Sequence, residues 1–432
     1  MNDEKGRLNI IFISSDKYPP IRPAARVIFQ EAFAKRGHQV DWLVQAKEPS
    51  TNPSVVNRTE EKNIGNGVAY IAPTYVGTSR LGRLKKHMID LANDLRIFPL
   101  MRKNRYNVIQ VKDKYLSAIP ALIVAKLYRV KFFYWLAFPH TEASIHQANN
   151  KFARYRYYYW IRGYFLKTLL YRVILPLSDH IFVQSDQMKL DIIKEGVDAH
   201  KMTPVPGSVD LDDIPYRTAT NGSDLFLNDK HKNIVYLGTL NRMRQLGVIF
   251  EAFQLVVQKH PEARLFILGA GDTEDDESYL KELVNTLNIK DEVTFTGFIP
   301  MTRAWEYIRA STVCLSPYYP TPILLSTSPT KLIEYMAMGK AVVGNEHPEQ
   351  QQVLDESGAG ICVPWDKNAF ADAIGALCDD PLKAEEMGRC GRVFVENNRT
   401  NKVMSDRVEE TYLRILGTGN NKPEPLSVRL DN

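Results

Sequence analysis

A lysine and a glutamate three residues apart, Lys331 and Glu334, follow a Ser-Pro pair in the stretch SPTKLIEYMAMGKAVVGNE. Side chains with this spacing lie on one face of a helix. The Ser-Pro pair is typical of a helix start, with Ser328 expected as its cap. Because the free amides and the dipole of a helix start attract anions, we expect Ser328, Thr330 and Lys331 to bind a phosphate-like group. The pattern alone equally allows an ordinary surface ion pair.

Two arginines, Arg242 and Arg244, lie in the turn GTLNRMRQLG between a predicted strand and a predicted helix. A guanidinium fixed at such a turn can stabilise the negative charge that develops on a phosphate leaving group. Two solvated arginines in an exposed loop would give the same pattern.

Polar side chains also follow two predicted strands of the first half directly. His140 comes after the strand 130–138, with Glu142 two residues further on, and Asp113 and Lys114 come after the strand NVIQV. The carboxyl ends of parallel strands form the edge at which α/β sheets bind ligands. A single histidine is more often structural or merely exposed. Its place at this edge makes His140 a candidate, with Glu142 as a weaker companion, and it makes Asp113 and Lys114 candidate contacts of a second substrate.

A basic and aromatic segment, residues 150–178, lies within a stretch that contains no acidic residue between Glu142 and Asp179. Basic groups combined with interfacial aromatic rings suit a helix that lies on an anionic bilayer. A packed helix with snorkelling arginines is the alternative. The stretch RLGRLKKH (80–87) can add to the same surface. The residues expected at this surface are Arg154, Arg156, Tyr159, Trp160 and Arg162.

The composition is that of an ordinary globular protein, with 44% hydrophobic and 24% charged residues among 432. Residues 1–200 carry 31 Lys and Arg against 17 Asp and Glu, whereas the remainder carries 24 against 33. The first half is therefore expected to face something anionic. We find no apolar run long enough to span a bilayer and no signal-peptide pattern. The four cysteines form no C-x-x-C pair, which argues against a zinc site and fits a reducing cytoplasm.

Strand and helix patterns alternate along the whole chain, and the strands are apolar on both faces. A turn-rich link at 205–232 separates two such series. We therefore predict an α/β protein with two doubly wound, Rossmann-like domains that face each other across a cleft. The predicted parts are a first domain (1–210), a second domain (211–400), a helix that crosses back (401–416) and a disordered tail (417–432).

Segments in the same order over about 380 residues resemble the retaining glycosyltransferases of family 4, which have the GT-B fold. SPTKLIEYMAMGKAVV is similar to the helix of the family's donor site, and LGTLNRMRQLGVIFEAF to its phosphate-binding loop and helix. The other similar segments are FISSDKYPPIRPAARV, AFAKRGHQV, HIFVQSDQMK with VPGSVD, FILGAGD, VTFTGFIP and SGAGICVPWDKNAF.

The resemblance implies roles for the candidate residues. Glu334 would bind the ribose hydroxyls of a nucleotide, Arg244 would bind the diphosphate with the amides of residues 328–331, and His140 would orient the transferred sugar. With this context we favour a functional role for Arg244 and leave both interpretations of Arg242 open. Asp113, Lys114 and Glu142 would contact the acceptor. The residues that the resemblance places around the donor are Thr239, Arg242, Phe298, Ile299, Ser328, Thr330 and Lys331.

Three positions depart from the family pattern. The first glutamate of its usual E-x7-E pair falls at Ser326, so recognition of the sugar is left open. Thr239 stands where the family usually has an arginine. The first loop reads Pro23-Ala24-Ala25 in place of Gly-Gly, and alanine restricts the close backbone approach that glycine allows.

The function predicted from these observations is that of a retaining glycosyltransferase. It would transfer a sugar from a nucleoside diphosphate sugar to a lipid-linked or growing glycan acceptor, in the cytoplasm on the inner face of the membrane. No cofactor and no metal are expected, since the acidic cluster 271–278 lacks ordered ligand spacing. The alternatives are a nucleotide-sugar epimerase of the same fold and a non-catalytic, basic nucleic-acid-binding protein. No recognisable nucleic-acid motif supports the latter.

Overall fold

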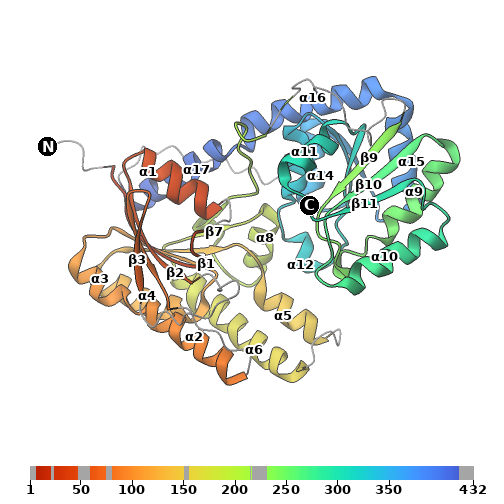
Figure 1. Cartoon of the computed structure of the whole chain (residues 1–432). Helices are drawn as coiled ribbons and strands as arrows, with labels where there is room; N and C mark the ends of the chain where they lie inside the picture. The colour runs from red at the N-terminus through yellow and green to blue at the C-terminus, as the bar shows by residue number, and fades with distance from the viewer. Residues whose placement is uncertain are drawn as a thin grey trace. The chain divides into compact units, whose positions relative to one another are not determined.

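The chain folds into two compact units, shown in Figure 1. Of the predicted site residues, Arg154 lies outside the residues that the structure describes. Pro23 and residues 418–432 of the predicted tail also lie outside them. The first unit comprises residues 1–183, 192–205 and 404–432, and the second comprises 184–191 and 206–403. The computed structural model describes residues 6–20, 24–46, 59–73, 80–149, 155–214, 216 and 231–417.

The first unit is built on an eight-stranded sheet with the strand order β3-β4-β2-β1-β5-β6-β7-β8. All neighbouring strands are parallel except the pair β3–β4. The order runs outward from β1 in both directions, which is the doubly wound arrangement that the alternating pattern predicts. The strands are β1 (Asn9–Lys17), β2 (Gln39–Gln45), β3 (Glu60–Ile64), β4 (Gly67–Ile71), β5 (Val108–Lys112), β6 (Lys131–Leu136), β7 (His180–Val183) and β8 (Met202–Pro204).

Helices cover both faces of this sheet (Figure 1). One face carries η1 and the C-terminal helix α17, whose buried Tyr412 packs on Phe29 and Phe133 and donates a hydrogen bond to Oε1 of Gln110. The helices of this half and the returning helix are η1 (Ala24–Ala32), α1 (Phe33–Lys35), α2 (Arg80–Asp94), α3 (Ile97–Lys103), α4 (Tyr115–Tyr128), α5 (His140–Asn149), α6 (Arg156–Leu169), η2 (Leu170–Ile174), α7 (Leu175–Leu177), α8 (Asp186–Lys194), η3 (Ala199–Lys201) and α17 (Asn401–Leu416).

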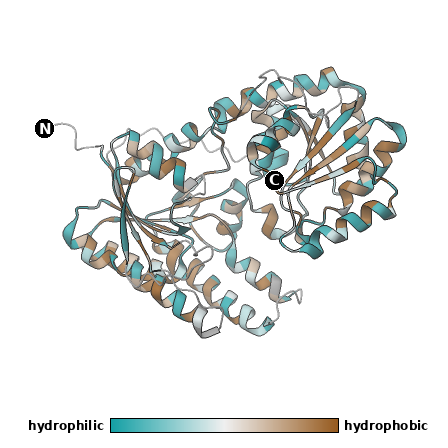
Figure 2. Ribbon diagram, viewed as in Figure 1, coloured by the Kyte–Doolittle hydropathy of each residue, from teal (hydrophilic) through white to brown (hydrophobic). Residues whose placement is uncertain are grey.

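The second unit is built on a six-stranded, wholly parallel sheet with the order β11-β10-β9-β12-β13-β14. Its four inner strands, β10, β9, β12 and β13, are largely buried, and the strands are drawn mainly in the brown of hydrophobic residues in Figure 2. The prediction of two α/β units with doubly wound, Rossmann-like sheets is thereby confirmed. The strands are β9 (Lys232–Leu237), β10 (Ala263–Leu268), β11 (Val293–Gly297), β12 (Val313–Ser316), β13 (Ala341–Asn345) and β14 (Gly360–Val363).

Successive residues of these strands feed two separate cores. Ile234 and Tyr236 of β9 pack with helices α9, α10 and α15, whereas Val235 packs with α11, α13, α14 and α16. This alternation is what a strand covered by helices on both faces requires. The helices are η4 (Arg242–Arg244), α9 (Gly247–Lys259), α10 (Glu274–Thr286), α11 (Met301–Arg309), α12 (Pro322–Leu325), α13 (Thr330–Ala337), α14 (Pro348–Ser357), α15 (Lys367–Asp379) and α16 (Pro381–Asn398).

Two stretches near the ends of the second unit's main segment pair with each other. The Val209 amide donates to the carbonyl of Arg399, and the Asn401 amide donates to the carbonyl of Val209. The Ser208 hydroxyl adds a hydrogen bond to Oδ1 of Asn401. The entering and leaving segments of the second unit are therefore fastened together as a short parallel bridge.

Among the helices that the structure describes, none combines the length and the hydropathy that crossing a membrane requires.

Candidate active site

The carboxyl edge of the second sheet gathers most of the predicted donor residues. The loop after β9 carries Thr239 and Arg244, and the loop after β11 carries Phe298. The segment after β12 leads through α12 into α13, which carries Lys331 and Glu334. Because all six strands are parallel, these loops leave the sheet at one edge, where such sheets bind ligands.

Arg244 is held by three polar partners. Its Nε donates to Oγ1 of Thr239 at 2.9 Å, and its guanidinium carbon lies 5.9 Å from the centre of the Tyr318 ring. Burial acts to lower the pKa of Arg244, but the phenol groups of Tyr236 and Tyr318 outweigh it and raise the pKa. Arg244 therefore keeps its charge in a half-buried, oriented position at the sheet edge.

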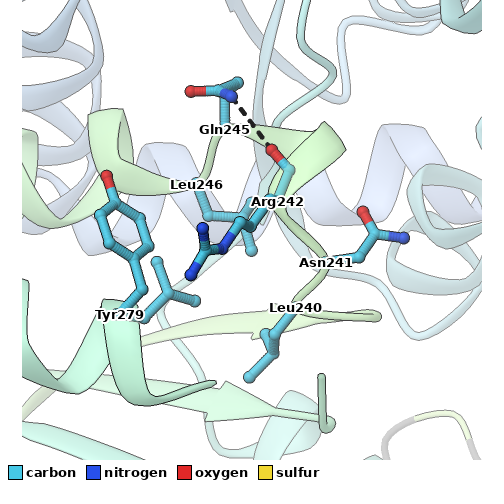
Figure 3. A pocket seen from close by; sticks show the side chains of 7 residues that line it. Leu240, Asn241, Arg242, Gln245, Leu246 and Tyr279 are labelled. Atoms are coloured by element: carbon cyan, nitrogen blue, oxygen red, sulfur yellow. Dashed lines mark hydrogen bonds between the residues drawn. The ribbon is translucent and has the colours of Figure 1, made fainter. Parts of the chain in front are cut away.

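Arg242 is directed away from Arg244, toward helix α10. Its Nη2 donates to the Asp275 carbonyl at 3.5 Å, its Nε lies 3.8 Å from Asp276, and its guanidinium carbon lies 5.7 Å from the Tyr279 ring centre. It lines a small pocket formed with the start of α9 and with α10 (Figure 3). The two arginines of this loop thus have different surroundings, and of the two only Arg244 lies beside the ring of Tyr318.

Helix α13 starts one residue later than the sequence predicts, and the predicted cap is wrong. The N-cap position is taken by Pro329, and no side chain caps the helix. The hydroxyl of Ser328 donates instead to Oε1 of Glu349 at 2.7 Å and accepts the Gly207 amide at 2.8 Å. The helix ends at Ala337, and Gly339 follows the C-cap Met338 with a φ of 70°, a left-handed conformation that glycine readily adopts.

Lys331 and Glu334 form the predicted pair on one face of α13. The ammonium of Lys331 lies 3.0 and 2.9 Å from the two carboxylate oxygens of Glu334, and both side chains are partly exposed. An acceptor of hydrogen bonds and a cation therefore stand side by side in the first two turns of the helix.

Glu349 is a buried carboxyl that the sequence analysis missed. It lies at the start of α14, is 5% exposed, and has Arg399 at 3.4 Å from Oε1. Its Oε2 is buried and has no hydrogen-bond partner among the described residues. Burial raises the pKa of Glu349 to about 7, and the charge of Asp186 adds to this, while Arg399 and Ser328 oppose it.

Tyr318 links these groups. It follows β12 and is fixed through its backbone, since its amide donates to Oδ1 of Asn345 and its carbonyl accepts from Nδ2 of the same side chain. Burial raises the pKa of Tyr318, Arg244 lowers it, and the carboxylates of Glu349 and Glu334 raise it. The charges of Arg244, Glu334 and Glu349 therefore all affect the pKa of this one phenol. The rule that singled out His140, a polar group directly after a strand, applies equally to Tyr318 and could have found it.

Phe298 and Ile299, two of the residues expected around the donor, differ in exposure. Phe298 is 88% exposed, whereas Ile299 is partly buried and packs on the core around α13. Both follow β11, whose last residue, Gly297, accepts a hydrogen bond from the Gly269 amide.

Ser326, which stands where the family has a glutamate, is fastened to the helix α8. Its hydroxyl donates to Oδ2 of Asp191 at 2.6 Å, and its carbonyl accepts the hydroxyl of Ser185 at 2.7 Å. The carboxylate next to Ser326 therefore comes from α8, and the Ser326 hydroxyl engages it.

In the first unit, Asp113 and Lys114 are buried. Oδ1 of Asp113, a residue with a φ of 53°, accepts the Ala137 amide at 2.9 Å. The ammonium of Lys114 lies 2.8 and 2.6 Å from the oxygens of Asp94, to which Ser117 also donates. These contacts give Asp113 and Lys114 structural partners, and the predicted contact with an acceptor stays a prediction.

His140 is exposed at the first position of α5, with its ring 4.9 Å from that of Phe138. The carboxylate of Glu142 accepts the Thr141 hydroxyl at 2.6 Å and has Lys167 at 3.8 Å. Glu142 therefore ties α5 to α6, while His140 lies at the sheet edge as predicted.

Helix α6 exposes the basic and aromatic side chains that the sequence singled out. Arg156, Trp160 and Arg162 are exposed and Tyr159 is half-buried. Further apolar exposure extends to the helices α2 and α4, and α2 packs against α4. Large exposed hydrophobic residues on the three helices are Leu84, Met88, Leu116, Ile123, Leu127, Tyr157, Tyr158, Ile161, Tyr164 and Phe165.

Within the described ranges, no group of three or more His, Cys, Asp or Glu side chains is placed to hold a metal ion.

Two protein-family models match consecutive parts of the chain. Residues 29–213 match the family model described as Glycosyltransferase Family 4, and residues 231–380 match the model described as Glycosyl transferases group 1. The two matches follow each other along the chain and fall on the first and second units respectively.

Curated relatives have low identity. A D-inositol 3-phosphate glycosyltransferase of Corynebacterium urealyticum is 25% identical over 364 residues, which cover 81% of this chain and 80% of the relative. A phosphatidyl-myo-inositol mannosyltransferase of Mycobacterium tuberculosis is 24% identical over 222 residues, half of this chain and 54% of the relative. The match therefore spans about half the length of the latter.

Solved structures share the fold. A sucrose-phosphate synthase of Thermosynechococcus elongatus superposes with a TM-score of 0.70 at 20% identity, covering 96% of this chain and all of that chain. The Anabaena protein HepE in complex with UDP-glucose gives a TM-score of 0.63 at 13% identity, covering 94% of this chain and all of that chain. At these identities the likeness shows the fold alone.

Proposed function

We propose, because this chain belongs to the family 4 glycosyltransferases of GT-B fold, that it is a retaining enzyme acting on a nucleoside diphosphate sugar. The bond between the anomeric carbon of the sugar and the leaving diphosphate breaks. A bond to an acceptor oxygen forms on the same face of the sugar, and the acceptor hydroxyl loses its proton. The acceptor is a lipid-linked or growing glycan.

The observation that carries the proposal is the arrangement around Tyr318 at the carboxyl edge of the second sheet. Arg244 is held against this phenol, and Glu334, paired with Lys331, is close enough to act on it. Negative charge develops on the diphosphate as it leaves, and an oriented, half-buried guanidinium stabilises that charge more than a solvated one does. Arg244 and Lys331 supply the positive charge, and Glu334 supplies an acceptor for ribose hydroxyls.

His140 is proposed to orient the transferred sugar. Its ring follows β6 at the carboxyl edge of the first sheet, and the loop before it is fixed by the hydrogen bond from Ala137 to Asp113. Asp113 thereby serves the site through the loop, whether or not it also touches the acceptor.

We place the enzyme on the cytoplasmic face of an anionic membrane, which α6 contacts. Tyr157 is 78% exposed and Phe165 is 61% exposed, beside the exposed arginines Arg156 and Arg162. Aromatic rings of this kind sit at the headgroup level, and each basic residue near the surface contributes about 1 kcal/mol. The names of the relatives fit a phosphate-bearing or lipid acceptor.

The donor is identified by thermal shift with UDP-, GDP- and ADP-sugars. Selective stabilisation by one of them is expected, with about 2.7 kcal/mol at a ligand concentration 100 times Kd. Glu334→Ala should weaken that binding at least about tenfold, since ribose hydroxyls lose a charged acceptor. Glu356→Ala, which removes an exposed glutamate of α14, is the matched control.

Unchanged affinity of Glu334→Ala would remove Glu334 from the site. A transferase should release nucleotide only when an acceptor is present. An epimerase would interconvert the bound sugar without net nucleotide release, so measuring release with and without an acceptor separates the two functions.

A further inference from the structure

The hydroxyl of Ser328 stands where a helix cap is expected, yet it is turned away from the helix. We propose that Glu349 is a positioning residue for donor binding, which holds this hydroxyl off the first-turn amides of α13 and so leaves them to the donor's diphosphate. The inference rests on the proposed function and adds to it a residue that does not itself touch the donor.

The hydroxyl of Ser328 has one hydrogen, and it donates this hydrogen in a hydrogen bond to Glu349. The distance from Oγ of Ser328 to Oε1 of Glu349 is 2.7 Å, and the Gly207 amide donates to the same hydroxyl at 2.8 Å. A serine at the N-cap would use its oxygen to accept from the amides of the second and third helical residues, which here would be Thr330 and Lys331. With its hydroxyl anchored between Glu349 and Gly207, Ser328 does not cap α13.

The starts of the helices in the second unit support this interpretation. Side chains cap α12, α14, α15 and α16, and a capping box closes the start of α10. Among the described α-helices from α9 to α16, those that lack a side-chain cap are α9, α11 and α13. These three follow the loops that carry Arg244, Phe298 and Ser328. Open helix starts therefore coincide with the predicted donor loops.

Stability alone does not explain why a buried carboxyl is the hydrogen-bond partner of Ser328. It is 5% exposed, with Arg399 at 3.4 Å and one buried oxygen without a hydrogen-bond partner among the described residues. Buried charges that are incompletely paired seldom stabilise a fold more than a well-packed apolar side chain does. A role in keeping the amides of α13 open explains why an acceptor is present at this place.

A purely structural role is the competing explanation. Glu349 also contacts Arg399, whose carbonyl accepts the Val209 amide, so it helps to fasten the segments that enter and leave the second unit. The two explanations differ in what a second substitution at Ser328 should do.

The test uses two variants of like size that differ in the acceptor. Titration calorimetry of the full chain with UDP, GDP and ADP first selects the nucleotide that wild type binds. Glu349→Gln keeps an oxygen for Ser328 and should retain the affinity. Glu349→Met removes the acceptor, frees Ser328 to cap α13, and should weaken binding about tenfold.

Removal of the freed hydroxyl should then restore binding. The double variant Glu349→Met with Ser328→Ala should match Ser328→Ala alone within about twofold. Glu356→Met on the same helix is the control for the substitution itself. A double variant that binds as weakly as Glu349→Met supports the structural explanation and overturns the inference.

The remaining outcomes are also decisive. If wild type binds a nucleoside diphosphate and Glu349→Met binds it equally well, the inference is overturned and the proposed function stands. Wild type that binds none of the three overturns both. If Glu349→Met does not fold, Glu349→Gln decides in its place, because loss of affinity with the acceptor kept contradicts the inference.

Discussion

The carboxyl edges of the two sheets are both formed by parallel strands, but they differ in how deeply their charged side chains are buried. In the first unit, the charged side chains at the end of β5 are buried and paired inside the unit, Lys112 with Asp16 and Lys114 with Asp94. In the second, Arg244, Lys331 and Glu334 are partly exposed on loops and on the first turns of a helix. Sheet topology therefore locates an edge, while burial decides whether its charged side chains stabilise the fold or remain accessible to a ligand.

The largest effect is expected from breaking a buried pair of the first unit. Lys114→Met leaves the carboxylate of Asp94 buried without its cation, which should cost roughly 3–5 kcal/mol of unfolding free energy in a urea titration. Lys126→Met, at an exposed lysine of helix α4, which Lys114 directly precedes, is the control and should cost little. Nucleotide affinity in the second unit should persist in conditions where the variant stays folded. Loss of transfer to the acceptor with unchanged stability would instead give Lys114 the contact predicted from the sequence.

The second effect is a pH dependence that distinguishes the buried carboxyl of the second unit. The folded state holds the proton of Glu349 up to a pKa of about 7, whereas the unfolded chain releases it near 4.5. The unfolded state therefore binds fewer protons between these values, and stability should fall as pH rises from about 4.5 to about 7. The groups that face this carboxyl are Ser328, Arg399, Asp186 and Tyr318.

Urea unfolding at several pH values checks this. The stability of wild type relative to Glu349→Gln should decrease by up to about 3 kcal/mol across the window, since one pKa unit corresponds to about 1.4 kcal/mol. Glu356→Gln should show no such trend. A constant difference between wild type and Glu349→Gln would mean that the carboxyl ionises normally despite its burial.

The third effect tests the oriented cation of the second edge. Arg244→Ala should lower turnover more than tenfold, about 1.4 kcal/mol or more, if the guanidinium stabilises the departing diphosphate. Arg242→Ala, from the same turn but directed to α10, should lose less. Steady-state kinetics with the donor found by the thermal-shift screen measures both. Equal losses would mean that the two arginines act alike, despite their different surroundings.

The smallest effect concerns the outer surface of the first unit. Arg156→Glu and Arg162→Glu should each weaken binding to vesicles that contain phosphatidylglycerol, because each basic side chain contributes about 1 kcal/mol at an anionic surface. Lys290→Glu and Lys383→Glu in the second unit match the change in net charge. Co-sedimentation with neutral and anionic vesicles measures the difference. Equal losses in both sets would point to net charge alone and remove α6 as the contact.

Much of the fold could be predicted from the sequence, because strands that are buried on both faces read as continuous apolar runs. The predicted helix 401–416 coincides with α17, and the predicted strand 130–138 contains β6. Two strands were missed for physical reasons. The strand β3, EEKNI, is an exposed antiparallel edge strand with almost no apolar pattern, and β8 has only three residues and ends in proline.

The site was predictable in its location and only partly in its contacts. Spacing gave the Lys331–Glu334 pair, and the strand-end rule gave Arg244 and His140. The partner of Ser328 could not be found, because Glu349 lies 21 residues away in the sequence and the sequence does not show which glutamates are buried. Likewise, nothing in the sequence distinguishes the directions of Arg242 and Arg244.

The second unit is not one continuous piece of chain, since residues 184–191 belong to it while the rest begins at residue 206. Ser185 and Asp191 of that short piece hold Ser326, two residues before the start of the donor segment. A second unit exchanged between relatives should therefore include 184–191 along with 206–403. A fragment that begins at residue 206 would lose both partners of Ser326.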